Sequence, residues 1–317
     1  MRTARRQPRL HRTLTIVAAI ACALTAASCS GHPASSAAAG DGDMNAGQPA
    51  LGTIPVLDSP RGLTLPIEAY LLTKNDVDQI THAQYLVVHR CMAEYGFDFK
   101  ESLTTTPAAD RDVDAANVLQ RYGVWDPQIA AAYGYHDPAQ FAPHPVDPEV
   151  PPTDAERLVL FGNTPGEGFE HAAQVYGGRP VPDHGCVGQG QREIGTGIDE
   201  RLAESINKAA FHQSMLDPRV QAAGSTWSKC MAAEGYQIAE PKDAPGFPVA
   251  QNPTSREIEV AKADIGCKRQ SNYIGTWYAV DAAMQTSLIG SHEEALAAMK
   301  QEARRTLRNA AATLAKG

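Results

Sequence analysis

The sequence predicts a mainly α-helical domain stapled by disulfides, and three observations lead to that fold class. Apolar residues recur at helical spacing over long stretches, whereas the sustained alternation typical of strands is scarce. A short motif occurs twice, at residues 90–97 (RCMAEYGF) and at residues 229–236 (KCMAAEGY). Each copy carries one cysteine, and each is followed later in the chain by a Gly-Cys pair, which suggests two disulfides.

Both copies of this motif, here called the Cys-Met motif, place Gly and an aromatic residue at the fifth and sixth positions after Cys. Each copy ends an amphipathic helical stretch. A glycine just past a helix supplies the left-handed residue of a Schellman cap, and the next residue can pack on the last turn. We therefore expect Gly96 and Gly235 to be helix caps. This signature is structural and carries no chemistry.

Four helix starts are marked by a capping pair or by a proline at the first helical position. They are Thr73 with Asp76, Asp217 with Pro218, Thr254 with Glu257, and Ser291 with Glu294. The first two helices are expected to end at the cap glycines. The helix that follows Thr254 is expected to continue to Ile289.

Three regions are expected along the chain: a signal peptide over residues 1–28, a disordered lipid-proximal tether over residues 29–61, and an α-helical domain over residues 62–317. Basic residues precede an uncharged run from Leu14 to Ser28, which is too short for an ordinary membrane span. The tether is rich in Ala, Gly, Ser and Pro, and such a composition buries too little apolar surface to become ordered.

The end of this apolar run resembles a bacterial lipobox, with Ala26, Ala27 and Ser28 followed by Cys29. The resemblance implies cleavage before Cys29 and acylation of its thiol. Ala26 stands where Leu is usual, and plain secretion after a small-residue site is the alternative. We expect a lipid-anchored protein that faces outward from the cell membrane.

The charge balance bears on possible partners. The chain has 28 basic and 36 acidic residues, and removal of five signal-peptide arginines raises the acidic excess from 8 to 13. An acidic surface repels nucleic acid and anionic lipid headgroups. We expect no nucleic-acid partner, and contact with the membrane only through the lipid anchor.

Cys22 leaves with the signal and Cys29 carries lipid, so four cysteines remain for pairing in an oxidising compartment. Three connectivities are possible. One Gly-Cys pair follows each Cys-Met motif, and each is followed in turn by Ile-Gly-Thr. This repetition favours the pairs Cys91–Cys186 and Cys230–Cys267.

The same repetition divides the helical domain into two related units, residues 62–214 and residues 215–317. Each unit reads helix, Cys-Met cap, loop, Gly-Cys and helix. The first unit contains a long proline-rich insertion over residues 100–183. Long insertions often carry recognition surfaces. The aromatic residues of the insertion either line a groove or pack the insertion on the helices.

Few residues suggest chemistry. Copper would suit the nitrogen, thiolate and thioether groups of one set: His89, Cys91, Met92, His184 and Cys186. The second unit has Ser228 and Ile265 in place of the histidines, which favours disulfides over a metal site. We expect no metal and no cofactor.

For a hydrolase, the candidate carboxylates are Glu167 and Glu170, beside His171. His136 and His144 lack metal-ligand spacing and are interpreted as surface or packing residues. We expect no catalytic residue among these groups.

Several features together resemble uncharacterised exported lipoproteins of Streptomyces-type actinomycetes. They are the run LPIEAY at residues 65–70, the two Cys-Met motifs, Trp227 three residues before Cys230, and YGYH at residues 133–136. The resemblance covers roughly residues 62–290 and implies where the protein is located and how its domain is built. We expect a non-catalytic envelope protein that binds a protein or wall component; the alternative is an exported hydrolase that acts on envelope glycan or peptide.

Overall fold

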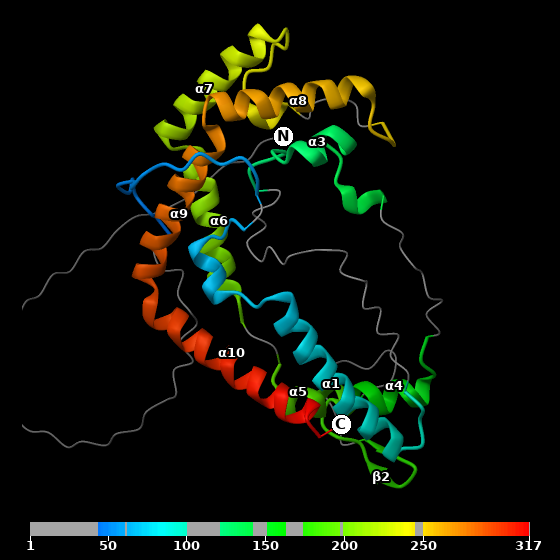
Figure 1. Cartoon of the computed structure of the whole chain (residues 1–317). Coiled ribbons are helices and arrows are strands. Elements are labelled where there is room, and N and C mark those ends of the chain that lie inside the picture. Colours follow the sequence, from blue (N-terminus) through cyan, green and yellow to red (C-terminus); the bar gives the residue numbers. More distant parts are fainter. Residues whose placement is uncertain are drawn as a thin grey trace, which may run out of the picture. The chain divides into compact units, whose positions relative to one another are not determined.

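Helices make up most of the described part of the chain, which confirms the mainly α fold class (Figure 1). The computed structural model describes residues 44–60, 62–99, 121–141, 151–162, 174–196, 199–244 and 250–316. The α-helices are α1 (Lys74–Glu94), α3 (Pro127–Tyr133), α4 (Asp154–Phe161), α5 (Gly185–Ile194), α6 (Arg201–Met215), α7 (Pro218–Ala233), α8 (Ser255–Gln270), α9 (Tyr273–Ser291) and α10 (Glu293–Leu314). The short elements are the 3-10 helices η1 (Pro66–Tyr70), η2 (Pro138–Phe141) and η3 (Pro241–Asp243), and the antiparallel strands β1 (Val175–Tyr176) and β2 (Arg179–Pro180).

The capping signals read from the sequence place three helix starts correctly. Before α1, the Thr73 hydroxyl accepts the Asp76 N–H at 3.1 Å, and the Asp76 carboxylate accepts the Thr73 N–H at 3.0 Å. Thr254 and Glu257 form the equivalent capping box before α8. Asp217 caps α7, which begins at Pro218 as predicted.

The prediction of one continuous helix from residue 254 to Ile289 is wrong, because the helical conformation is interrupted after α8. Ser271 donates its hydroxyl back to the Cys267 carbonyl, and Asn272 has a left-handed φ of 47°. Asparagine tolerates this backbone region better than most residues. The local bond of the Ser271 side chain competes with the helix ladder, the Asn272 side chain donates to the distant Pro55 carbonyl, and a new helix, α9, starts one residue later.

Both predicted disulfides are confirmed. Cys91–Cys186 joins α1 to α5 with Cα atoms 5.6 Å apart, and Cys230–Cys267 joins α7 to α8 with Cα atoms 5.5 Å apart. A small apolar cluster surrounds each bridge: Met92, Val159 and Leu160 near the first, and Trp227, Met231 and Val260 near the second. Each bridge is therefore part of a packed helix pair.

Both Cys-Met motifs end in the Schellman geometry expected from their glycines. Gly96 has φ 86° and Gly235 has φ 91°. In the first motif the Gly96 N–H donates to the Ala93 carbonyl at 3.0 Å, and the Phe97 N–H donates to the Met92 carbonyl at 3.1 Å. The second motif makes the equivalent pair of bonds. These are the 5→2 and 6→1 bonds that define the motif.

Helices from the two predicted units pack on one another. The last helix, α10, packs on α1 and α5, while α6 packs on α9 (Figure 1). The downstream halves of the units also differ. Cys186 is the second residue of α5, whereas Cys267 lies near the end of α8. The repetition in the sequence thus marks two similar capped, disulfide-linked helices inside one set of packed helices.

The largest apolar cluster lies around α6 and α9. It takes in Ile67 of η1 and Leu296 of α10, and its members on α9 include Trp277, Val280 and Leu288. Almost every face of α9 is covered, which is why its sequence has no polar stripe. Among the described residues, no helix is long and apolar enough to cross a membrane.

Residues 44–60 differ from the predicted tether, since they lie against the helical domain. Ala46 is buried, and its N–H donates to the Gln213 side chain at 2.8 Å. Arg219 donates to the Pro49 carbonyl at 3.0 Å, and Asn272 donates to the Pro55 carbonyl at 3.1 Å. Helix side chains thus form hydrogen bonds with the backbone of this segment, which composition alone predicts to be disordered. Residues 1–43, with Cys29, lie outside the described residues.

Candidate functional site

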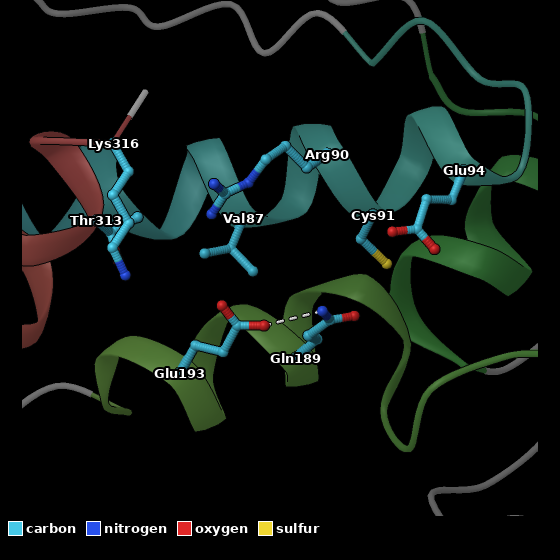
Figure 2. A pocket seen from close by; sticks show the side chains of 8 residues that line it. All are labelled: Val87, Arg90, Cys91, Glu94, Gln189, Glu193, Thr313 and Lys316. Atoms are coloured by element: carbon cyan, nitrogen blue, oxygen red, sulfur yellow. Dashed lines mark hydrogen bonds between the residues drawn. The ribbon is translucent and has the colours of Figure 1, made fainter.

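An open hollow of about 350 Å³ lies between α1, α5 and α10, beside the Cys91–Cys186 disulfide (Figure 2). Its lining consists of Val87, Arg90, Cys91 and Glu94 from α1, Gln189 and Glu193 from α5, Thr313 from α10, and Lys316 just after α10. Three segments that are far apart in the sequence therefore meet here.

Helical spacing explains why these side chains share one place. Residues three and four apart lie on the same face of a helix. The four α1 residues follow this spacing, and so do Gln189 and Glu193 on α5. Val87 and Cys91 are buried at the helix contact, whereas Arg90 and Glu94 are exposed. The hollow therefore has an apolar floor and a charged rim.

The rim carries both signs of charge. Gln189 donates to the Glu193 carboxylate at 2.9 Å, a bond that is drawn in Figure 2. Within the described part of the chain, no ion pair engages Arg90, Glu94, Glu193 or Lys316. Two cations and two carboxylates at one open site can form complementary ionic contacts with a partner, which favour specificity and fast association.

A second set of polar side chains holds the described part of the insertion on the helices. Three buried carboxylates supply it: Glu257 and Asp264 on α8, and Asp281 on α9. Asp281 accepts from Arg121 Nε at 2.5 Å and from the Tyr122 hydroxyl at 3.0 Å. Burial, followed by the Asp281 charge, raises the pKa of Tyr122 well above its ordinary value, so the phenol stays a donor.

Asp264 is the centre of the next group of contacts. It accepts from Lys268 Nζ and Trp227 Nε1, both at 2.9 Å, and from the Tyr135 hydroxyl at 3.3 Å. Lys268 also donates to the Val124 carbonyl at 2.8 Å. Burial raises the pKa of Asp264, while the Lys268 charge and the three donors act in the opposite direction.

Glu257 completes the set. Its Oε1 accepts the Tyr135 N–H at 2.9 Å and lies 2.8 Å from His136 Nδ1. His136 Nε2 lies 2.9 Å from the Ala250 carbonyl oxygen. The pKa of His136 is raised, first by the contact with the Ala250 carbonyl and then by the Glu257 carboxylate, which together outweigh its desolvation.

These contacts bear on the two interpretations of the insertion. Of its described aromatic residues, Tyr122 and Trp125 are buried in the cluster around α9, and Tyr135 packs near the second disulfide. Tyr133 and Phe141 stack on each other near the surface, with ring centroids 5.6 Å apart. Most of the aromatic surface described here packs the insertion on the helices.

The copper set considered from the sequence is not assembled as a metal site. Cys91 and Cys186 form a disulfide, which removes the thiolate that the set requires. Met92 is buried, His89 lies against Tyr85, and the His184 side chain is 56% exposed. No group of three His, Cys, Asp or Glu residues within the described ranges could hold a metal ion.

The carboxylate candidates cannot be placed. Glu167, Glu170 and His171, and also His144, lie outside the described residues. His136 is a buried packing residue, in agreement with one of its two predicted environments.

The buried charged residues on α8 and α9 were not predicted from the sequence. A signal for them exists, since Val260, Asp264 and Lys268 are spaced by four and lie on one face of α8. An acid and a base that continue an apolar stripe point to a buried ion pair. Nothing equivalent marks Asp281, whose partners come from a distant segment.

No protein-family model, curated protein or solved structure matches the chain. The chain is therefore assigned to a structural class from the features of its own structure. Its described residues form a mainly α-helical domain with two disulfide-linked helix pairs, a part of the insertion held by buried carboxylates, and a charged hollow beside a disulfide.

Proposed function

We propose that the chain is a non-catalytic, lipid-anchored protein of the cell envelope that binds a protein or wall component through the charged hollow. The observation that carries this proposal is the hollow itself. Arg90 and Lys316 stand there beside Glu94 and Glu193, and none of these four is engaged in an ion pair within the described residues.

The frame around the hollow supports a binding role. The Cys91–Cys186 bridge fixes α1 against α5, and α10 packs on both helices. A surface whose backbone is already held in place loses little conformational entropy when a partner binds. The location is supported by the two disulfides, which persist in oxidising compartments, and by the lipobox-like run before Cys29.

Site-specific photo-crosslinking in the native cell tests the proposal. A photoreactive residue replaces Gln189 inside the hollow or, as the control, the exposed Ala222 on α7. The proposal predicts one dominant envelope component linked at position 189 and none at position 222. Replacing Arg90 with Glu should weaken that product several-fold because it reverses a rim charge.

Equal products at both positions, or none at position 189, would contradict a binding role for the hollow. Incubation of the purified chain with isolated cell wall and with envelope peptides addresses the hydrolase alternative. Release of soluble fragments at a rate proportional to protein concentration would contradict the non-catalytic part of the proposal.

A further inference from the structure

His136 faces an oxygen acceptor on each side of its ring. Nδ1 lies 2.8 Å from Glu257 Oε1, and Nε2 lies 2.9 Å from the Ala250 carbonyl oxygen. His136 and Glu257 are 5% and 6% exposed, so water does not readily replace the contact between them. A neutral imidazole has one N–H donor and one acceptor nitrogen. It can therefore satisfy only one of these two oxygens.

The position of the extra proton follows from the partners. A carbonyl oxygen can only accept, so Nε2 carries hydrogen toward Ala250. Glu257 Oε1 also accepts the Tyr135 N–H at 2.9 Å, and its Oε2 lies 3.5 Å from the Thr254 N–H of the capping box. The arrangement is thus an imidazolium that donates to a carboxylate and to a carbonyl.

The other groups around the ring carry no charge that changes this assignment. The Phe141 ring of η2 has its centroid 5.8 Å away, and the backbone N–H of His136 donates to the Tyr133 carbonyl. On the face of α8 that carries Glu257, the next charged residues are Asp264 and Lys268, which pair with each other. Glu257 is therefore the charged group that acts on the protonation of His136, together with the Ala250 carbonyl.

We infer that His136 and Glu257 form a proton-dependent latch, which holds residues 134–141 and the backbone at Ala250 on α8 and opens as the pH rises. Loss of the proton leaves one ring nitrogen with a lone pair that faces an acceptor, either Glu257 Oε1 or the Ala250 carbonyl oxygen, a contact that is repulsive and costly. The segment sits directly on this carboxylate. A Cβ added at Gly134 would lie 2.7 Å from Glu257 Oε1.

The direction of the pH effect follows from the folded-state pKa. Because the pKa of folded His136 is raised above that of the unfolded chain, the latch is fully closed below the ordinary histidine value. Its contribution is lost as the pH rises through the higher folded value. The pairs Lys268–Asp264 and Arg121–Asp281 remain in place, so opening is confined to the segment after α3. This latch operates whatever the hollow binds.

Hydrogen exchange of the full chain between pH 5.5 and pH 9, corrected for the intrinsic rate, tests the latch. Amide protection of residues 134–141 should fall by up to tenfold for each pH unit between the ordinary histidine pKa and the higher folded pKa of His136, and it should level off above the folded pKa. Protection of α1 and α5, which the first disulfide joins, should stay unchanged over the same range.

Two variants separate the latch from general packing. In Glu257→Gln, the amide oxygen can take the place of Oε1, where it accepts both the Tyr135 N–H and an Nδ1–H of a neutral His136. Gln also serves in a capping box. Protection in this variant should no longer depend on pH. His136→Phe should leave residues 134–141 weakly protected at every pH. His82→Gln, on an exposed face of α1, is the control and should keep the wild-type profile.

Three results would overturn the inference. The first is wild-type protection of residues 134–141 that stays flat with pH, and the second is a Glu257→Gln variant that keeps the wild-type pH profile. The third is an NMR titration of the wild-type chain in which His136 titrates at or below the ordinary histidine pKa. This last measurement needs no variant and stands even if a substitution impairs folding.

Discussion

Lys268 and Asp264 form an ion pair inside the helical domain, with Nζ 2.9 Å from Oδ2 and side chains that are 4% and 0% exposed. The lysine also donates to the Val124 carbonyl of the insertion, and the aspartate also accepts from Trp227. The pair therefore links α8 to the insertion and to α7. Breaking a buried pair by removing one partner is costly because it leaves an uncompensated charge.

Lys268→Met should destabilise the fold by about 3–5 kcal/mol at neutral pH, measured by denaturant unfolding. The loss should shrink in acid, because burial raises the pKa of Asp264 and a protonated carboxyl needs no counter-charge. The double variant with Asp264→Asn should be more stable than Lys268→Met alone. Lys74→Met is the control at the exposed pair with Asp78, and it should cost less than about 1 kcal/mol. Equal losses in the two lysine variants would contradict the role given to Lys268.

The cap glycines allow a test of backbone strain without steric overlap. Gly96 and Gly235 have φ near +90°, yet an added Cβ would meet no atom within 4 Å at either position. Gly→Val at each should therefore cost about 1–2 kcal/mol through strain alone, and Gly→Asn should cost less. Gly266→Ala in the interior of α8, with equal space and ordinary φ, should gain about 0.5–1 kcal/mol. Thermal unfolding measures all these changes. Val as stable as Gly would mean that the caps are not left-handed.

Local signals made part of this fold predictable. The caps at Gly96 and Gly235, and the helix starts after Thr73 and Thr254, depend on residues within one turn of each other. The disulfides were found because the sequence repeats around each cysteine. The break at Asn272 was missed because it is stabilised by a contact with Pro55, which no window around residue 272 contains.

The candidate hollow was partly visible in the sequence. Arg90 and Glu94 lie within the first Cys-Met motif, on the face of α1 that carries Cys91. Gln189 and Thr313 come from helices whose packing on α1 no periodicity specifies. The latch between His136 and Glu257 likewise joins residues 121 positions apart. Such sites exist only once the helices have packed.

The packing of residues 44–60 on the domain can be tested at Gly275, near the start of α9. A Cβ added there would lie 1.9 Å from the Pro55 carbonyl oxygen, so Gly275→Ala should displace this segment. Hydrogen exchange or limited proteolysis should then show weaker protection of residues 44–60. Gly290→Ala lies on the same helix with no atom within 4 Å and should leave that protection unchanged. Equal protection in both variants would favour the tether predicted from composition.

The proposed location depends on Cys29, and one measurement tests it most directly: the intact mass of the protein isolated from the membrane fraction of its native cells. The account predicts a chain that begins at Cys29 and carries the added mass of one lipid group with two acyl chains, attached through the Cys29 sulfur, because two acyl chains anchor firmly whereas one binds marginally. Cys29→Ser should move the protein out of the membrane fraction without added acyl mass. An unacylated wild-type chain that begins elsewhere, or unchanged membrane retention of Cys29→Ser, would contradict the lipid-anchored envelope protein proposed here.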